Sequence, residues 1–303
     1  MLGKLERIAP TAGRSFRVLQ WSNNLREVEC LLDANHAERI TGKGAQWHHH
    51  VEMELTAFTA GQGVFFVGDH IGPFAAGEVV LLGENLPHHW HTRGPSAGFS
   101  VQWNFPPEHA LWAFPESLPL SDMFKRAGHG IRYTGHTAAA VTAGLGEIAR
   151  AAGLDRVGLL LRLLSLMANA PTSEQNLLSR RSFSLPADSI QQQAIKDALR
   201  YLLANFRNEI RLADVLRLTR MSKATFSLQF KKYSGKTFSE VVSQLRLQSA
   251  CRELVETDRP VLTIALSCGF TEISFFNRLF RRVLRRSPTE YRMQERRRRK
   301  GPE

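Results

Sequence analysis

The C-terminal part of this chain repeats itself with a period of 50 residues, and this feature constrains the fold more than any other. The paired positions have the same apolar, aromatic, basic or acidic character. They are Leu212 and Leu262, Leu216 and Leu266, Phe226 and Phe276, Phe230 and Phe280, Lys231 and Arg281, Lys232 and Arg282, and Glu240 and Glu290. Self-similarity at a fixed period indicates a duplicated structural unit. The region is therefore expected to fold as two copies of one short motif.

Each copy has the pattern of two helices joined by a tight turn. A short apolar helix is followed by a few turn residues and then by a helix with aromatic residues at positions i and i+4 and two basic residues behind them. This is the helix-turn-helix spacing, in which the first helix braces the second and the second enters the major groove of DNA. Ser222 is expected to cap the first recognition helix, and Gly269 to form the turn before the second. A helical bundle with a solvated basic face is the alternative, but it gives no reason for basic pairs in both copies.

The positive charge of the chain is concentrated in the same region. Residues 1–170 carry 14 Lys and Arg against 15 Asp and Glu, whereas residues 171–303 carry 26 against 13. A basic half joined to a neutral one indicates a polyanionic partner, and double-stranded DNA fits the repeat better than a membrane surface does. The basic tail, residues 296–303, begins with RRRRK and is expected to be disordered.

Helix phase identifies the faces that would meet DNA once the paired Phe side chains are buried. The outward positions are Lys223, Ala224, Ser227, Leu228 and Lys231 in the first copy, and Ser274, Asn277, Arg278 and Arg281 in the second. Asn277 matches adenine and Arg278 matches guanine in bidentate contacts. The basic pairs suit phosphates; they are Lys231, Lys232, Arg281 and Arg282. For any one of these residues, the alternative is a solvated surface position without a DNA contact.

Residues 190–292 resemble the AraC/XylS family of bacterial transcription regulators. The segments that carry the resemblance are MSKATFSLQFKKYSGKTFSE, VVSQLRLQSACRELVETD, TIALSCGFTEISFFNRLFRR and SPTEYR. The second copy keeps the family pattern, whereas the first departs from it at Leu216, Arg220 and Leu228, where a small residue, Gly and Arg are usual. The resemblance implies a DNA-binding domain over residues 190–295, with RNA polymerase as a further partner. Because of these departures, we expect the second motif to dominate the choice of DNA sequence.

The N-terminal half has a different periodicity. Short apolar runs rich in Val, Phe and Leu recur about every ten residues from 14 to 105, which predicts an antiparallel barrel over residues 1–108. Residues 109–170 switch to helical spacing, and the last helix is apolar around much of its circumference, so it requires a cover. The barrel or a second copy of the chain could provide that cover, and the second choice implies a homodimer. Residues 171–189 are polar and Ser-rich, which is typical of an interdomain linker.

All eleven histidines lie within the first 136 residues, so imidazole chemistry belongs to the N-terminal half. On a strand, alternation would place four polar side chains of the run GAQWHHHVEMEL on one face, namely His48, His50, Glu52 and Glu54. The run LPHHWH adds His88, with His89 and His91 beside it. Two or three His with one carboxylate are the ligands of a divalent metal. The predicted ligands are His48, His50, Glu54 and His88.

The same residues resemble the two cupin motifs over about residues 40–95. Gly42 or Gly44, Gly61, Gly77 and Pro87 take the matching positions, but the usual Gly between Pro and His is missing from the second motif. The resemblance implies a cupin-like sensor barrel, whose histidines would either hold a metal or line the pocket of a small, sugar-like effector. Trp47, Trp90 and Trp103 would stack on a sugar face or belong to the barrel core. The expected effector-binding residues are His48, His50, Glu52, Glu54, His88 and Trp90.

The sequence thus predicts an α+β chain of two domains, a cupin-like antiparallel barrel with a helical dimerisation segment, followed by an all-α domain with tandem helix-turn-helix motifs. The predicted function is a transcription regulator that responds to a small molecule, with the sign of regulation left open. The alternative is a cupin metalloenzyme, an oxygenase or isomerase, with an accessory nucleic-acid-binding domain, and it leaves the repeat unexplained. An architectural DNA binder leaves the barrel unexplained. Three cysteines without metal or redox spacing, and no secretion signal or membrane span, favour a cytoplasmic protein that joins the nucleoid when bound to DNA.

Overall fold

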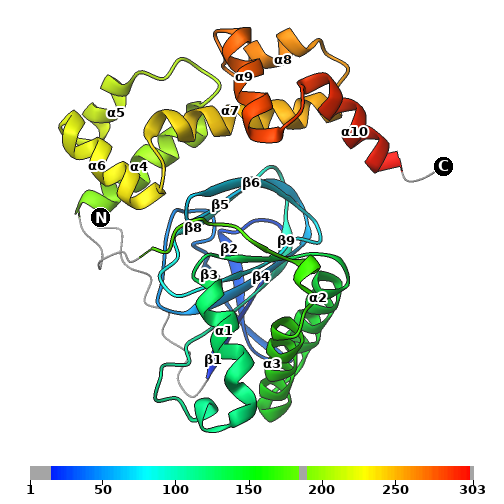
Figure 1. Ribbon diagram of the computed structural model, residues 1–303. Coiled ribbons are helices and arrows are strands. Elements are labelled where there is room, and N and C mark those ends of the chain that lie inside the picture. The colour runs from blue at the N-terminus through cyan, green and yellow to red at the C-terminus, as the bar shows by residue number, and fades with distance from the viewer. Residues whose placement is uncertain (1–14, 184–189, 301–303) are drawn as a thin grey trace. The chain divides into compact units, whose positions relative to one another are not determined.

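The computed structural model describes residues 15–183 and 190–300 (Figure 1). The chain forms two compact units, Met1–Ser189 and Ile190–Glu303. The first is built on antiparallel sheets with helices, and the second is helical throughout its described residues, so the predicted α+β class with two domains is confirmed. Within the described ranges, no helix has the length and apolar character needed to cross a membrane.

Two sheets form the frame of the N-terminal unit. The larger has the strand order β11-β10-β7-β4-β9-β1-β2-β3 and the smaller has the order β6-β5-β8. All of their pairings are antiparallel. The strands are β1 Phe16–Trp21, β2 Glu27–Asp33, β3 His36–Thr41, β4 Met53–Ala60, β5 Gln62–Val67, β6 His70–Ala75, β7 Val79–Leu82, β8 His88–Thr92, β9 Ala97–Trp103, β10 Ile131–Tyr133 and β11 Gln175–Leu177.

The central strands of the larger sheet are covered on both faces, and strand alternation assigns each of their residues to one face. In β4, Leu55 and Ala57 join the core beneath the helices, whereas Phe58 joins the core shared with the smaller sheet. Glu54 and Thr56 point to the same side as Phe58 and line a pocket between the sheets. This alternation explains how a strand that is buried over most of its length can carry polar residues.

Helices cover the outer face of the larger sheet. They are α1 Leu118–Ala127, α2 Gly135–Arg150 and α3 Gly153–Ala168, with 3-10 turns at η1 Ala110–Ala113, η2 Pro115–Ser117 and η3 Thr172–Glu174. The apolar side chains Leu160, Leu163 and Leu164 of α3 are buried in the core that includes the sheet. Helices α2 and α1 of the same unit pack against this helix and cover much of it, while Leu154 near its N-terminus is 83% exposed.

The boundaries expected between residues 109 and 189 need correction. The segment predicted as helical also contributes β10, and the first half of the predicted linker contributes β11, which pairs with β10 at the sheet edge. The Ser179 hydroxyl donates a hydrogen bond to Asp69 Oδ1 at 2.9 Å. The sequence showed no sign of this edge strand, because its residues are polar and its pairing partner, β10, lies about 40 residues earlier in the chain. Residues 184–189, the rest of the predicted linker, lie outside the described residues.

The C-terminal unit contains the two predicted motifs. Its helices are α4 Ile190–Asn205, α5 Leu212–Thr219, α6 Lys223–Ser234, α7 Phe238–Glu256, α8 Val261–Ser267, α9 Ile273–Leu284 and α10 Pro288–Lys300. The pair α5 and α6 and the pair α8 and α9 are the two copies of the repeat. The alignment of Glu240 with Glu290 has a simple cause, since each carboxylate accepts a hydrogen bond from the backbone N–H of the residue three positions earlier, Thr237 or Ser287, both at 2.7 Å. Each copy therefore ends in a capping box that starts the next helix.

The basic tail is not disordered where the structure describes it, because α10 continues to Lys300. Arg292 Nε donates to Leu254 O and Arg296 Nε donates to Val255 O, each at 3.0 Å. These carbonyls belong to the last turn of α7, which has no further helical N–H groups to bond them. Arginines are favourable at such a helix end. A run of charges gives no sign of acceptors that lie about 40 residues away, and residues 301–303 lie outside the described residues.

Candidate functional site

The first recognition helix, α6, exposes the face that helix phase predicts. Ser222 caps it by accepting a hydrogen bond from Thr225 N at 3.2 Å. Phe226 and Phe230 are fully buried. Every residue of this helix that was predicted to contact DNA is exposed, and Leu228 is 67% exposed; the set is Lys223, Ala224, Ser227, Leu228, Lys231 and Lys232. The helix thus offers an apolar centre and a basic end.

The second recognition helix, α9, has the same buried side and a more polar outer side. Phe276 and Phe280 are fully buried. Asn277 is half-buried, and the remaining predicted residues are exposed; they are Ser274, Arg278, Arg281 and Arg282. Arg278 takes the position that Leu228 has in the first copy, so only the second copy offers a charged donor at the centre of its exposed face.

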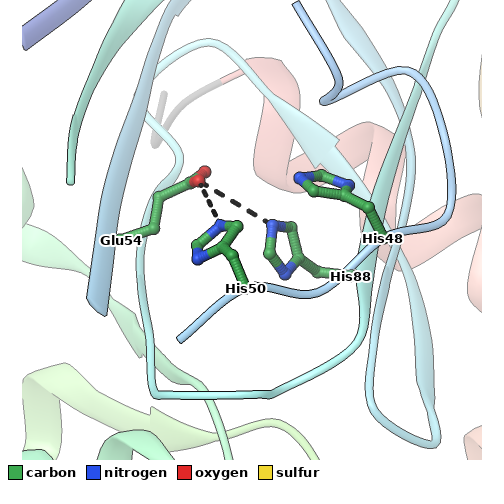
Figure 2. Close-up of side chains that lie close together, drawn as sticks. All are labelled: His48, His50, Glu54 and His88. Carbon is green, nitrogen blue, oxygen red and sulfur yellow. Dashed lines mark hydrogen bonds and ion pairs between the residues drawn. The ribbon is translucent and has the colours of Figure 1, made fainter. Parts of the chain in front are cut away.

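In the N-terminal unit, four polar side chains meet in the interior (Figure 2). One ligand atom from each lies within 4.8 Å of the others, and all four side chains are buried; they are His48, His50, Glu54 and His88. Glu54 lies on β4 and His88 on β8, so the two sheets face each other across this cluster.

The two histidines that precede β4 reach the cluster by a route other than the predicted strand alternation. Among residues 47–52 the only bridge is that of His48 to His88, with backbone N–H to O distances of 3.1 and 2.9 Å. Glu52 is left out of the group, and its Oε2 lies 3.6 Å from His50 Nδ1, whereas Glu54 faces Nε2 of the same ring. The irregular segment, rather than a continuous face, thus decides which carboxylate joins the cluster.

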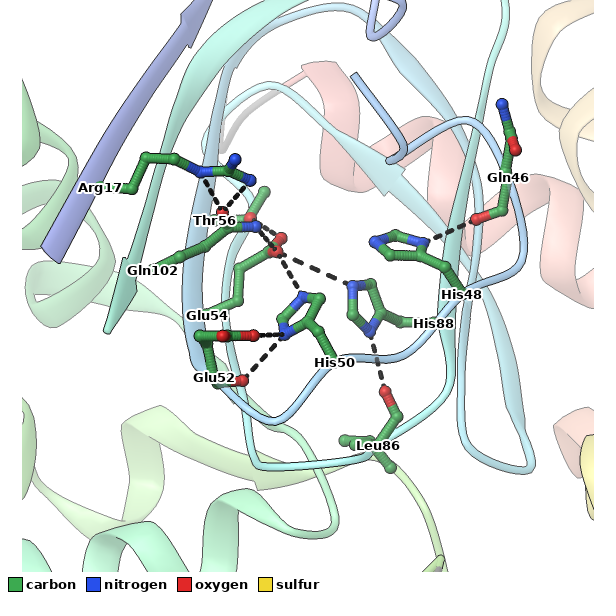
Figure 3. A network of polar contacts seen from close by, with 10 residues as sticks. All are labelled: Arg17, Gln46, His48, His50, Glu52, Glu54, Thr56, Leu86, His88 and Gln102. Atoms are coloured by element: carbon green, nitrogen blue, oxygen red, sulfur yellow. Dashed lines mark hydrogen bonds and ion pairs between the residues drawn. The ribbon is translucent and has the colours of Figure 1, made fainter. Parts of the chain in front are cut away.

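Backbone carbonyls fix the orientation of all three imidazoles (Figure 3). The Nδ1 atoms of His48, His50 and His88 lie 2.8, 2.9 and 2.8 Å from the carbonyl oxygens of Gln46, Glu52 and Leu86. A carbonyl oxygen only accepts hydrogen bonds, so each Nδ1 carries the proton and each Nε2 keeps a lone pair in the neutral ring. This is how metal-binding histidines are commonly held.

The carboxylate and the lone pairs face one another at short distance. Glu54 Oε2 lies 3.1 Å from His50 Nε2 and 3.8 Å from His88 Nε2. Acceptor atoms in this arrangement need a proton or a cation between them. Thr56 Oγ1 and Gln102 Nε2 donate to the two oxygens of Glu54, both at 2.6 Å, and these bonds favour the ionised carboxylate. The donor set therefore fits a divalent metal ion.

Burial and neighbours set the protonation of the cluster. Burial lowers the pKa of His48 well below its usual value, and the nearby His88 and His50 lower it further. Burial alone would raise the pKa of Glu54, but the imidazoles of His50 and His88 outweigh it and hold that pKa below its usual range. A neutral His48 beside an ionised carboxylate is the state that a metal requires.

A pocket that is partly open to solvent adjoins this cluster, and the 470 Å³ of empty space at this place includes open solvent. Of the tryptophans considered from sequence, Trp90 lines it, while Trp103 packs in the core beneath the helices and Trp47 packs edge-on against Phe66. The lining also includes polar residues that sequence reasoning missed, among them Arg17, Ser100 and Gln102. Their signal was present, because each is polar within an otherwise apolar strand and so breaks the pattern of a fully buried strand.

Comparisons with known proteins bear on both units. Residues 215–294 match a helix-turn-helix domain family. The regulatory protein PocR of Salmonella typhimurium is 34% identical over 44% of this chain, which spans 42% of PocR's length. The transcriptional activator RhaS of Pectobacterium carotovorum is 24% identical over 82% of this chain and 87% of its own. The regulatory protein SoxS of Salmonella typhimurium is 30% identical over 33% of this chain and 94% of its own.

Solved structures also match part of this chain. A probable AraC family transcriptional regulator from Rhodopseudomonas palustris is 27% identical over 35% of this chain and 99% of its own, with a TM-score of 0.33. The DNA-binding domain of AdpA, solved with a target DNA, is 26% identical over 36% of this chain and 98% of its own, with a TM-score of 0.34. Since the duplicated motif agrees with the helix-turn-helix match and with the nearly full-length match to SoxS, this chain belongs to the AraC family of transcriptional regulators.

Proposed function

We propose that this chain is a transcription regulator that binds double-stranded DNA through α6 and α9 and senses a small molecule in the N-terminal pocket. The observation that carries the proposal is the pair of exposed recognition helices, each with buried Phe residues on one side and a basic pair at its C-terminal end. Two such helices read two successive stretches of major groove. The named relatives are regulators, which favours this function over catalysis.

On DNA, the two helices divide the contacts by chemistry. Arg278 is suited to the O6 and N7 atoms of guanine and Asn277 to adenine, whereas Leu228 offers only apolar contact, for instance to a thymine methyl group. The exposed basic residues lie at the helix ends and suit phosphates; they are Lys231, Lys232, Arg281 and Arg282.

Salt dependence tests the DNA-binding proposal. Four phosphate contacts predict a logarithmic slope of about −3 to −4, so affinity for a duplex should fall about a hundredfold from roughly 50 to roughly 200 mM salt. Fluorescence anisotropy of a labelled duplex measures this for the full chain and for residues 190–303. A flat salt dependence, or no binding by residues 190–303, would contradict the proposal.

The cluster of His48, His50, Glu54 and His88 would hold a divalent transition metal. When bound, the ion would supply a positive centre at one end of the pocket. Protons compete with metal for imidazole nitrogens, and because the pKa of His48 is lowered, zinc affinity should fall as the pH drops below the usual imidazole pKa of about 6.5. Competition with a chromophoric chelator measures it, the double variant His48→Ala/His50→Ala should lose binding, and the exposed His36→Ala serves as control. Equal zinc binding by the double variant would contradict the metal site.

The pocket is proposed to couple to DNA binding, because its polar end is made of the same residues as the metal cluster. The double variant His48→Ala/His50→Ala should lose any effector-dependent change in DNA affinity while keeping effector-free binding. Retention of a full effector response would place the sensor elsewhere.

We also propose a homodimer formed through α2 and α3, and RNA polymerase as a partner. Leu154 and Leu161 of α3 are exposed apolar residues, and a second copy would cover them. Leu161→Glu should therefore shift the sedimentation coefficient from dimer to monomer, whereas an unchanged dimer would move the interface to another surface.

A second function rests on one observation, the metal donor set beside an open pocket, which is an arrangement that metalloenzymes also use. An oxygenase or isomerase activity would show as turnover of a bound ligand by the metal-loaded protein. Recovery of the ligand unchanged after prolonged incubation would exclude turnover of that ligand.

A further inference from the structure

The pocket changes from polar to apolar along the strands that form it. The sheet register defines three rows across β1, β9 and β4. The rows are Arg17 with Gln102 and Glu54, then Leu19 with Ser100 and Thr56, then Trp21 with Gly98 and Phe58. The first row is charged and polar, the second is mixed, and the third is aromatic. A ligand lying along the strands therefore meets charge at one end and rings at the other.

The apolar end extends beyond the strands of these rows. Leu25, Val28 and Ile40 also line the pocket. Gly98 belongs to this end for a steric reason, since a Cβ there would lie 2.6 Å from the Trp21 ring. The hydroxyl groups of a sugar would lose water against the aliphatic side chains of Leu25, Val28 and Ile40 without gaining hydrogen bonds, which is costly. An aliphatic or aromatic group fits it.

The polar end carries linked charges (Figure 3). The Arg17 guanidinium donates to Gln102 Oε1 at 2.9 and 2.7 Å, and Gln102 Nε2 donates to Glu54. A divalent ion at the cluster would add positive charge near this guanidinium. A carboxylate placed here would meet both in charge-assisted contacts, whereas a neutral oxygen would not.

Three buried donors also line the pocket. Within residues 15–183 and 190–300, no group pairs with Ser100 Oγ, Trp21 Nε1 or Trp90 Nε1. Each of these residues is at most 5% exposed. Buried donors are normally paired, so an occupant that brings an acceptor oxygen to the middle row would satisfy Ser100. Ser100 lies in the middle row, two residues before Gln102 on the same face of β9. Its hydroxyl can donate a hydrogen bond to an oxygen held at the charged end.

We propose that the pocket binds a small carboxylic acid with an apolar body, its carboxylate at the row of Arg17, Gln102 and Glu54 and its body toward Trp21. This inference rests on the proposed function, because it assigns the ligand class of the proposed effector site. A hydroxyl group beside the carboxylate would give the acid two oxygens for the metal end. Charge-assisted contacts with a guanidinium favour a carboxylate over a neutral oxygen.

A matched ligand series tests the proposal by calorimetry on the full chain loaded with zinc. Lactate, 2-hydroxyisovalerate and phenyllactate share the same 2-hydroxycarboxylate and differ in the size of the apolar body. Affinity should rise along this series, and replacing the carboxylate of phenyllactate by a hydroxymethyl group should weaken binding about tenfold or more. Equal binding of acid and alcohol, tighter binding of arabinose than of every acid, or no binding by any acid would overturn the proposal.

Variants locate the carboxylate. Arg17→Gln should weaken phenyllactate binding about tenfold and leave the alcohol unaffected, and Arg17→Lys should restore part of the loss. Arg39→Gln removes an exposed arginine on β3 and is the matched control. Tryptophan fluorescence checks folding, because all five tryptophans lie in this unit. An unchanged preference for the acid in Arg17→Gln would overturn the placement.

The outcomes separate this inference from the proposed function. Metal content is measured on the same samples, so a protein that holds no zinc refutes the metal centre, and the acid and alcohol comparison on that protein still decides the ligand class. DNA affinity is measured separately, without ligand. If the protein does not bind DNA, the proposed regulator function is wrong, but the measured preference of the pocket for an acid or an alcohol still stands.

Discussion

The two helix-turn-helix copies have the same interior but differ at their surfaces and turns. Both bury a Phe pair at the same offset, and both lead into a capping box. The exposed centre of the recognition helix is Leu228 in the first copy and Arg278 in the second. The interior positions have kept the chemistry that packing requires, while the exposed positions, which packing does not constrain, have diverged.

The turns differ in a reciprocal way. The brace helix ends in a left-handed residue that is Arg220 in the first copy and Gly269 in the second, whereas the recognition helix is followed by Gly235 in the first and Arg285 in the second. Glycine adopts this conformation without a steric penalty, and arginine does not. Each copy therefore has one relaxed turn and one strained turn.

The largest expected effect concerns Gly269. A Cβ at this position would lie 2.8 Å from Arg207 O and 2.9 Å from Phe206 O, and the backbone φ is +91°. Gly269→Ala should therefore lower the free energy of unfolding by about 3 kcal/mol. Urea unfolding followed by far-ultraviolet circular dichroism measures the helical unit. Arg220→Ala, at the corresponding turn, is the control and should change stability little; equal effects would mean that the turns are equivalent.

Base reading should differ between the copies. Arg278→Ala should weaken binding to one operator by about 1 to 3 kcal/mol and relax base preference at one position. Leu228→Ala should cost less than about 0.5 kcal/mol, because it removes no hydrogen bond to a base edge. Binding-site selection with each variant measures this. Equal information content in the two half-sites would contradict dominance of the second copy.

Phosphate contacts should be alike in the two copies. Lys232→Ala and Arg282→Ala remove equivalent positions of the repeat, so each should weaken binding to all sequences and reduce the salt slope by about 1. Anisotropy titrations at several salt concentrations measure both. A change of base preference in either variant would mean that this residue reads sequence instead.

The smallest effect should be a gain. Arg220→Gly relieves a left-handed arginine but adds backbone entropy to the unfolded chain, so the net stabilisation should be about 0.5 to 1 kcal/mol. Arg285→Gly should do the same in the second copy. The same dichroism measurement detects both, and a loss of stability would mean that the arginine side chains make contacts that outweigh the strain.

Much of the C-terminal unit followed from the sequence because its information is local. Helix phase, the Phe pairs and Ser222 act within one or two turns, so the printed sequence identified the exposed faces. The prediction that failed, a disordered basic tail, depended on non-local contacts, since the arginines of α10 bond the end of α7 from about 40 residues away. Periodicity describes one element at a time and gives no distance between elements.

The N-terminal unit shows the same division more strongly. The sequence by itself determined an antiparallel barrel and the four residues of the His and Glu cluster. Only the tertiary structure decided by which backbone route His48 and His50 reach Glu54, that Arg17 and Gln102 extend the cluster into a pocket, and that β11 closes the sheet edge. The reason is physical: residue type fixes what a side chain can bind, whereas strand register and the bridge between His48 and His88 fix which side chains meet.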